Sequence, residues 1–372
     1  MIDRRLLKNF DWSMMVLTLI TSAVGVILIY SATHTNKYNQ LYWKQIHWIG
    51  VGLAAMILTI CIDYRILAKY SFVLYFMSIC ALLYVLFFSQ SIQNVKRWIT
   101  IGSVSIQPSE FIIVAVVILL AKYFEDSRKM PFDLFDIIIS GIFVIIPLVL
   151  ILKEPDLGTA MLLIPIYLVI IFIAGFELRY LGYLVGLGLI TLLILLLLVF
   201  WVKPKGILLK DYQKARMIAF LNPNADPLGS GYHIIQSKIA IGSGGFWGKG
   251  LLAGTQSQLK FLPVQHTDFI FSVLAEELGF IGSVIVLGLL FFILLKGIDT
   301  ALKSGDRLGS IMAIGIVTII LIHILVNVGM VLGLLPITGL TLPLISYGGS
   351  SILATMVKIG LLINIRIRRF MV

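Results

Sequence analysis

The sequence predicts an all-α integral membrane protein, built as a bundle of about ten transmembrane helices. Of its 372 residues, 59% are hydrophobic and only 13% are charged, and the mean hydropathy is +1.03. A soluble protein carries about 25% charged residues, so a water-soluble or a disordered chain is excluded. The apolar residues are grouped into runs of about 20, the length that crosses the hydrocarbon core as a helix.

Ten such apolar runs occur, and each is expected to form one helix. In chain order they cover residues 12–31, 45–62, 70–89, 106–121, 134–152, 157–176, 179–202, 268–295, 308–334 and 340–365. No charged residue occurs between Arg307 and Lys358, a stretch of 50 residues that is too long for one crossing. The turn residues of Gly333-Leu334-Leu335-Pro336 divide this stretch in two. Residues 1–372 are therefore predicted to form a single polytopic membrane domain.

The distribution of Lys and Arg predicts the orientation of the bundle. If the N-terminus is cytoplasmic, 15 basic residues fall on the cytoplasmic side and five in the short outer loops. This asymmetry follows the positive-inside rule, and an even number of crossings places both termini in the cytoplasm. The net charge of +11 could otherwise indicate nucleic acid. In a membrane protein it indicates cytoplasmic loops or an anionic substrate, so no nucleic-acid partner is expected.

Residues 203–267, between the seventh and eighth spans, are predicted to form a large, partly structured extracytoplasmic loop. In its glycine-rich stretches 242–245 and 248–250 the backbone is expected to approach another segment closely or to take a positive φ. The loop has two acids and eight basic residues, which are Lys203, Lys205, Lys210, Lys214, Arg216, Lys238, Lys249 and Lys260. These residues either meet lipid head groups or, together with backbone N–H groups, hold a diphosphate.

Asp268 is the sole acidic residue between Asp226 and Glu276, and it opens the eighth span. A helix N-terminus favours an ionised carboxylate, so Asp268 or Thr267 could simply cap this helix. The alternative is a functional carboxylate at the outer membrane surface, facing the basic loop. In that role Asp268 could act as general base toward a hydroxyl, or hold a divalent cation against a diphosphate.

Four ionisable residues are expected inside the membrane, where such groups usually face a cavity or a partner. Glu276 and Glu277 follow Asp268 by about two helical turns, and Lys358 in the last span is their predicted partner. Glu110 in the fourth span has similar status, with Arg97 in the preceding outer loop. For these residues a structural buried pair and the polar floor of a cavity are both open interpretations.

Seven segments spread over the chain match motifs of a known family. They are Lys96-Arg97-Trp98-Ile99, Gln107-Pro108-Ser109-Glu110, Glu154-Pro155-Asp156-Leu157-Gly158-Thr159, Tyr212-Gln213-Lys214-Ala215-Arg216, and residues 231–279, 327–336 and 342–351. These motifs resemble the SEDS family (shape, elongation, division and sporulation), and in particular its elongation branch. One position departs from the resemblance. Many relatives have Lys three residues after the Glu of Gln-Pro-Ser-Glu, whereas this chain has Ile113, so that Glu–Lys pair is absent.

The resemblance implies a ten-helix glycosyltransferase of the bacterial cytoplasmic membrane, which polymerises lipid II into peptidoglycan on the outer face for cell elongation and rod shape. It implies as partners a class B penicillin-binding protein (the transpeptidase), other membrane proteins of the elongation complex and membrane lipids. The family's essential Asp, in His-Thr-Asp-Phe, corresponds to Asp268, the predicted catalytic residue. Substrate binding is predicted for Arg97, Lys214, Arg216, Lys238, Lys249 and His266. A divalent cation (Mg²⁺ or Mn²⁺), if one takes part, is expected at Asp268.

Two other functions stay open at the level of sequence. Charged residues inside the bundle are compatible with a transporter that flips lipid II, although the sequence has no pair of interrupted helices at corresponding positions of two halves. A scaffold that only docks a penicillin-binding protein is the third interpretation. For the polymerase, direct displacement with inversion is expected, because a retaining mechanism needs a second close carboxylate and none is obvious near Asp268 in the chain.

Overall fold

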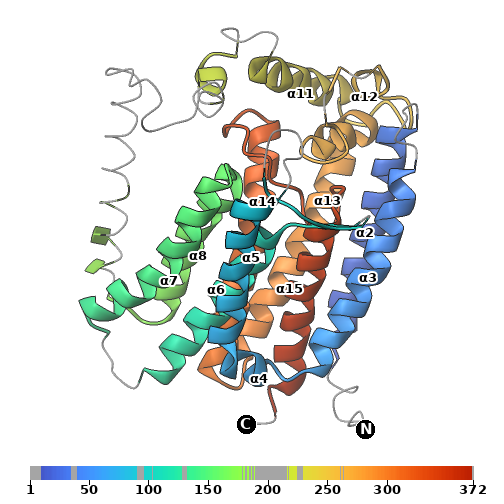
Figure 1. The fold of residues 1–372 in the computed structure, drawn as a ribbon. Coiled ribbons are helices and arrows are strands. Elements are labelled where there is room, and N and C mark those ends of the chain that lie inside the picture. The colour runs from blue at the N-terminus through green and yellow to red at the C-terminus, as the bar shows by residue number, and fades with distance from the viewer. Residues whose placement is uncertain are drawn as a thin grey trace, which may run out of the picture.

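The computed structural model describes residues 10–34, 40–89, 96–102, 104–127, 132–177, 179–180, 182–183, 186, 188, 216, 218–223, 229–259, 261–262 and 264–370. Long helices run side by side, and the helical segment 230–258 of the predicted outer loop lies across one end of this bundle (Figure 1). We call this segment the outer segment, and the end of the bundle that it covers the outer end. The elements are α2 (Trp12–Thr33), α3 (Leu41–Cys61), α4 (Tyr64–Lys69), α5 (Ser71–Phe88), β1 (Ile99–Ile101), β2 (Val104–Ile106), α6 (Pro108–Asp126), α7 (Leu134–Lys153), α8 (Leu157–Ile173), α11 (Ser230–Gly244), α12 (Thr255–Gln258), α13 (Ile270–Leu302), α14 (Arg307–Val331) and α15 (Gly349–Arg368).

Nine of the ten predicted spans coincide with a helix, which confirms the membrane bundle. Among the described residues, seven helices are long and apolar enough to cross a membrane, and α6 and α8 are the two further spans. The remaining predicted span, 179–202, lies almost entirely outside the described residues. Large apolar side chains such as Phe76, Phe87 and Phe135 are exposed on α5 and α7, as expected for helices that face lipid.

The last span begins at Gly349, later than the predicted start at residue 340. Residues 337–348 form an irregular loop instead. Pro343 disfavours a helix through this segment, and Gly339 (φ 82°) and Leu344 (φ 67°) both have left-handed backbone conformations. As described below, this loop packs against the backbone around Asp268.

A break in α13 brings the outer segment into contact with the bundle. Gly279 has φ 66° and ψ −164°, a conformation that glycine alone adopts readily. Beside the break, the Phe280 N–H donates to the Gly245 carbonyl (2.9 Å). A Cβ added at Gly248 would lie 2.2 Å from the Glu277 carbonyl oxygen. The close approach that the glycine-rich stretches predict is therefore confirmed.

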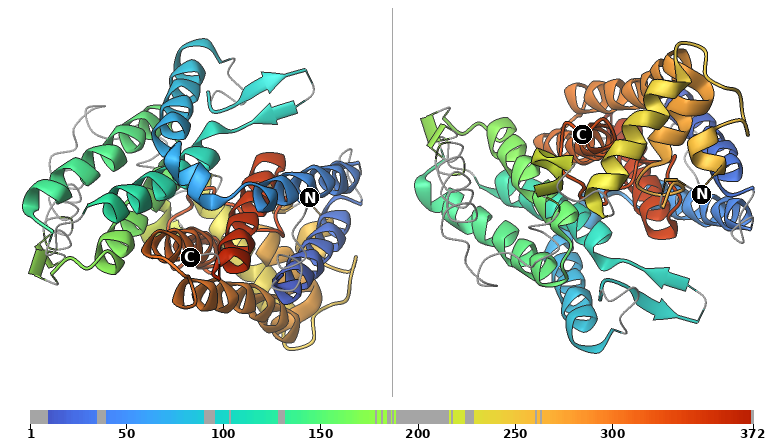
Figure 2. Two further views of the ribbon diagram at one scale, coloured as in Figure 1. Left: turned by 90° about the horizontal axis from the view of Figure 1, so that it is seen from below. Right: turned by 90° about the horizontal axis from the view of Figure 1, so that it is seen from above.

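Two features were not predicted from the sequence. Strands β1 and β2 form an antiparallel hairpin, with Ile99 opposite Ile106, that projects from the side of the bundle (Figure 2). The hairpin leads directly into α6. The helix α11 lies across the end of the bundle and packs against α13 and α14 (Figure 2).

The start of α2 and the end of α15 lie together at the opposite end of the bundle (Figure 1). Arg366 Nε is 3.0 Å from Asp11 Oδ2, which joins these two helix ends. Both ends of the described chain thus lie on one side, as an even number of crossings requires.

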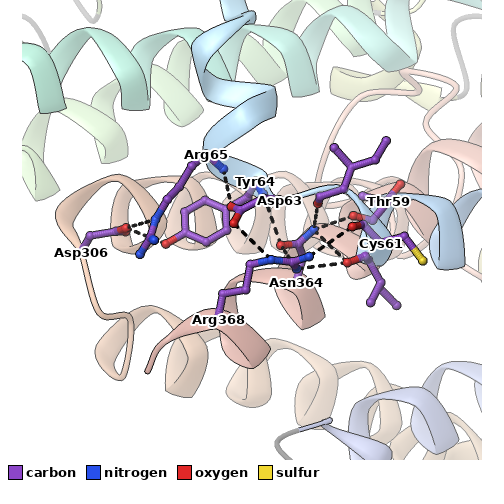
Figure 3. Close-up of polar contacts among 10 residues, drawn as sticks. Thr59, Cys61, Asp63, Tyr64, Arg65, Asp306, Asn364 and Arg368 are labelled. Carbon is purple, nitrogen blue, oxygen red and sulfur yellow. Dashed lines mark hydrogen bonds and ion pairs between the residues drawn. The ribbon is translucent and has the colours of Figure 1, made fainter. Parts of the chain in front are cut away.

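A dense polar network ties the helices together at this end (Figure 3). The Tyr64 hydroxyl donates to Asp306 Oδ2 (2.6 Å), and Arg65 Nε is 3.0 Å from the same oxygen. Arg368 donates to Asn364 Oδ1 (2.6 Å). Asn364 in turn donates to backbone carbonyls at the end of α3. The network links α3 and α4 to the start of α14 and the end of α15.

Candidate active site

Asp268 lies in the turn that precedes α13, and two other parts of the chain hold its backbone. The Asn327 side chain, on α14, donates to the carbonyls of Asp268 (3.0 Å) and Leu340 (2.7 Å). The Ser346 hydroxyl donates to the Thr267 carbonyl (2.7 Å). The loop 337–348 and α14 thereby fix the backbone at Asp268.

Two arginines from distant segments act on the Asp268 carboxylate. Arg216 donates to the Ile337 carbonyl (3.2 Å), and Arg97 donates to the Glu154 carbonyl (3.1 Å). Burial raises the pKa of Asp268, while the hydroxyl of its neighbour Thr267 and the charges of Arg216 and Arg97 oppose that rise. The structure thus brings together three of the predicted site residues, which are far apart in sequence.

Asp156 is a residue of this site to which the sequence analysis gave no role. Its carboxylate accepts from the Gln107 side chain (2.8 Å) and the Thr159 hydroxyl (2.8 Å), and it lies 3.9 Å from an Arg97 nitrogen. Its negative charge raises the pKa of Asp268 further. The Asp-x-x-Thr spacing is typical of a helix cap, and Asp156 does cap α8, so the sequence signal pointed only to a structural role.

Glu154 lies beside this cluster and is almost completely buried, with 1% of its surface exposed. Neither of its carboxylate oxygens has a hydrogen-bond partner in the described part of the chain. Burial raises its pKa to about 8, helped by the charge of Asp156 and opposed by Arg97. Such an unsatisfied buried carboxyl group is costly and is typical of functional sites.

His266 and Lys238 also lie at the outer end. The His266 ring packs edge-on against Tyr347 at 5.8 Å, and burial lowers the pKa of the imidazole, which favours its neutral form. Lys238 is exposed on α11, with its ammonium close to the backbone of Gly333. Lys214, the remaining loop residue predicted to bind substrate, lies outside the described residues.

Lys249 forms an ion pair within the protein. Its ammonium is 2.8 Å from Glu276 Oε1, and the same carboxylate accepts from the N–H groups of Gln256 (2.9 Å) and Ser257 (3.2 Å). Glu276 therefore anchors α12 and the outer segment to α13. The Lys249–Glu276 ion pair therefore has a structural role, which is to hold the outer segment on α13.

The predicted pairing of Lys358 with Glu276 or Glu277 is wrong. Lys358 Nζ lies 3.6 Å from Glu110 Oε2, and His323 Nε2 lies 4.0 Å from Glu110 Oε1. The two glutamates of α13 precede the helix break and bind the outer segment and α2, whereas Lys358 is in the middle of α15. The cation beside Glu110 thus comes from another helix.

Two hollows open beside the site and share Ile106 in their linings. One, of about 640 Å³, is lined by side chains that include Lys44, Trp48, Trp98 and Tyr347. The other, of about 420 Å³, runs along α3, α5, α6 and α15 and is lined almost entirely by apolar residues. A hollow with polar and aromatic lining residues therefore lies next to an apolar groove.

The donor set at Asp268 is sparse for a metal. Among the described residues, no group of three or more His, Cys, Asp or Glu side chains has a geometry that could hold a metal ion. Asp156, a carboxylate whose charge acts on Asp268, is already hydrogen-bonded by Gln107 and Thr159. A cation at Asp268 would need most of its ligands from a substrate or water.

The fold and this cluster define a class: a multi-pass membrane protein in which the charges of two arginines act on a carboxylate at one end of the bundle. Residues 11–370 match the sequence model of the FtsW, RodA and SpoVE cell cycle proteins, and the chain belongs to this family.

Relatives and solved structures agree with this assignment. The chain is 38% identical to the peptidoglycan glycosyltransferase MrdB of Escherichia coli (98% of this chain, 95% of the relative). It is 35% identical to the peptidoglycan glycosyltransferase RodA of Treponema pallidum (97% and 98%). It also resembles a chain of a peptidoglycan synthase complex that polymerises and crosslinks (32% identity, TM-score 0.81, 97% and 98% covered) and Thermus thermophilus RodA (27% identity, TM-score 0.71, 97% and 98% covered).

Proposed function

We propose that this chain is a peptidoglycan glycosyltransferase that polymerises lipid II for cell elongation, with Asp268 as its catalytic carboxylate. The activity is that of the relatives named RodA and MrdB, which align over nearly the whole chain. The residue assignment is supported by the charges of Arg97 and Arg216, two residues far from Asp268 in sequence, which both act on its carboxylate.

The chemistry requires a base and a positive field at one place. A sugar hydroxyl of the acceptor attacks the anomeric carbon of the donor, and Asp268 takes the hydroxyl proton. The bond from that carbon to the lipid diphosphate breaks, and the diphosphate leaves with the bonding electrons. Arg97 and Arg216 stabilise the charge that develops on it, since guanidinium groups suit phosphate oxygens.

The surroundings of Asp268 favour direct displacement with inversion. The structure does supply a second carboxylate, Asp156, within electrostatic range. Its oxygens accept from Gln107 and Thr159, and it caps α8, so it is not available as a nucleophile. Glu154 has oxygens without a partner in the described residues, but only 1% of its surface is exposed, so it cannot reach the anomeric carbon, and the retaining route is disfavoured.

The two neighbouring hollows suit an amphiphilic substrate. The apolar groove along α3, α5 and α6 would take the polyprenyl chain. The hollow above it, lined by Lys44, Trp48 and Trp98, would take polar parts of the molecule. Residues of the hairpin β1–β2 line both hollows, and this hairpin begins two residues after Arg97.

The cellular setting belongs to the same proposal. Both termini lie in the cytoplasm of a bacterial cell and the site lies on the outer face of its cytoplasmic membrane, a topology supported by the distribution of basic residues. The partner is a class B penicillin-binding protein within the elongation complex, which is supported by the resemblance to a chain of a peptidoglycan synthase complex. A divalent cation between Asp268 and the diphosphate is part of this proposal, and it is tested by the effect of a chelator on polymerisation.

The test is polymerisation of purified lipid II by the detergent-solubilised chain, with and without the partner and with and without a chelator. Wild-type protein is expected to make glycan polymer, and Asp268→Ala to make none. Asp126→Asn, an exposed acid near the end of α6, is the matched control and should polymerise normally. Polymer of normal length and rate from Asp268→Ala would overturn the residue assignment. An absence of polymer from wild type with its partner would overturn the enzyme and favour transport or scaffolding.

A further inference from the structure

Three titratable side chains meet in the interior of the bundle, away from Asp268. They are Glu110 on α6, His323 on α14 and Lys358 on α15, and each is at least 94% buried. Glu110 lies 3.6 Å from the Lys358 ammonium and 4.0 Å from His323 Nε2. Buried charges are costly in a membrane, and they are retained mainly where they serve a function.

Lys358 is the group that compensates the Glu110 charge. His323 Nδ1 is 2.8 Å from the Ile319 carbonyl, which can only accept, so Nδ1 carries a proton. In the neutral ring, Nε2 then presents a lone pair toward Glu110, not a positive charge. Ile113, one turn further along α6 than Glu110, is apolar and completely buried.

The three helices that meet in this cluster are the helices whose outer ends hold the site. On α14, His323 lies one turn inward from Asn327, which binds the Asp268 carbonyl. On α6, Glu110 lies one turn inward from Gln107, which binds the Asp156 side chain.

The third helix is tied to the second at the same level. At the start of α15, the Ser350 hydroxyl accepts from the Gln107 N–H (3.0 Å), and Lys358 lies about two turns inward from Ser350. The buried cluster therefore joins α6, α14 and α15 directly beneath the contacts that fix Asp268 and Asp156.

We propose that Lys358 is a positioning residue for polymerisation: its ion pair with Glu110 holds the outer ends of α6, α14 and α15 in the arrangement that the site needs. In this proposal it does not matter whether the lysine that pairs with Glu110 is on α15 or on α6. A lysine at position 113 would reach Glu110 from one turn away on α6 and should form an equivalent ion pair. The proposal rests on the polymerase activity proposed above.

The experiment is a set of four variants of the full chain, assayed for lipid II polymerisation and for thermal unfolding. Lys358→Met is expected to lower kcat by about a hundredfold with little change in KM, since small displacements of catalytic groups have effects of this size. Ile113→Lys alone should also lower kcat, because two lysines then face one carboxylate. The double variant Ile113→Lys/Lys358→Met is expected to recover kcat to within about threefold of wild type, a strongly non-additive result.

A fourth variant separates positioning from simple charge balance. Glu110→Gln/Lys358→Met removes both charges, so the thermal midpoint should recover from that of Lys358→Met while kcat stays low. Ile359→Met, a buried neighbour on α15, is the control and should keep wild-type kcat.

The outcomes against the proposal are distinct. Wild-type kcat in Lys358→Met would overturn it. So would recovery of kcat in Glu110→Gln/Lys358→Met, or a folded but inactive Ile113→Lys/Lys358→Met. Every comparison is made against active wild type, so a failure of the proposed polymerase function would appear separately, as wild type without polymer.

Discussion

The two ends of the bundle carry polar clusters of opposite character. At the end with the termini, the side chains of the network centred on Asp306 and Asn364 have partners at hydrogen-bond distance (Figure 3). At the outer end, Glu154 has two buried oxygens without a partner in the described residues, and Asp268 faces its arginines at electrostatic range. The polar side chains of the first cluster are fully hydrogen-bonded, whereas carboxyl groups of the second still have oxygens that can accept hydrogen bonds from a substrate.

This difference separates polar groups that hold a fold from polar groups that act. A buried polar group without a partner costs free energy, so a structural network saturates its donors and acceptors. A site that must bind a charged substrate cannot do so, because its groups need to exchange partners during the reaction. The predictions below test whether the two clusters divide stability and activity in this way.

The largest effect is expected from removing one carboxylate charge at each end. Asp268→Asn should reduce polymerisation at least about a hundredfold, the usual contribution of a general base, and leave the thermal midpoint nearly unchanged. Asp306→Asn should do the opposite, because Asp306 caps α14 and accepts from Tyr64 and Arg65. Polymerisation rate and thermal unfolding, measured on both variants, give the comparison. The proposed division of stability and activity between the two clusters would be wrong if Asp306→Asn lost activity while remaining as stable as wild type.

A smaller effect is expected from the arginines, and it has a direction in pH. Arg216→Ala removes a charge that lowers the pKa of Asp268, so the acid limb of the kcat/KM profile should move to higher pH. The lost phosphate contact should also raise the lipid II concentration required by about tenfold. Arg216→Lys keeps the charge and should restore the pH profile but only part of the affinity. An unchanged profile and unchanged kinetics in Arg216→Ala would instead indicate contact with lipid head groups.

The sequence predicted the helices well because a membrane leaves the backbone few choices. An apolar run of about 20 residues satisfies its backbone hydrogen bonds only as a helix, so length and hydropathy were enough for nine of the spans. The start of α15 was missed because residues 340–348 are as apolar as a span. Their irregular path depends on Pro343 and on positive φ angles at Gly339 and Leu344.

Only part of the site was predicted from the sequence. Contacts between helices depend on how each helix is rotated about its axis and on where helices break, and one sequence does not reveal either. Asp268 stood out as a lone acid in a basic region, and its grouping with Arg97 and Arg216 agrees with the predicted chemistry. The partner of Lys358 was assigned wrongly because Gly279 reads as an ordinary helical glycine, although it breaks α13. Asp156 was given no role, because nothing in its spacing shows that Gln107 and Arg97 converge on it.

The smallest and most specific effect is expected at Glu154, whose buried carboxyl group, without a hydrogen-bond partner in the described residues, should lower the free energy of unfolding. The folded-state pKa of about 8 lies above the usual 4.5, so between these values the folded protein binds more protons than the unfolded chain. The free energy of unfolding should therefore fall as pH rises through this window. Glu154→Gln has no such dependence, so its thermal midpoint should exceed that of wild type by a margin that grows between pH 6 and pH 8, by about 2–4 °C for each 1 kcal/mol. The exposed Glu177→Gln is the control, and its midpoint should track wild type at both pH values. A margin that stays constant with pH would show that Glu154 is ionised in the folded protein, and hence that the outer end is as saturated as the network around Asp306.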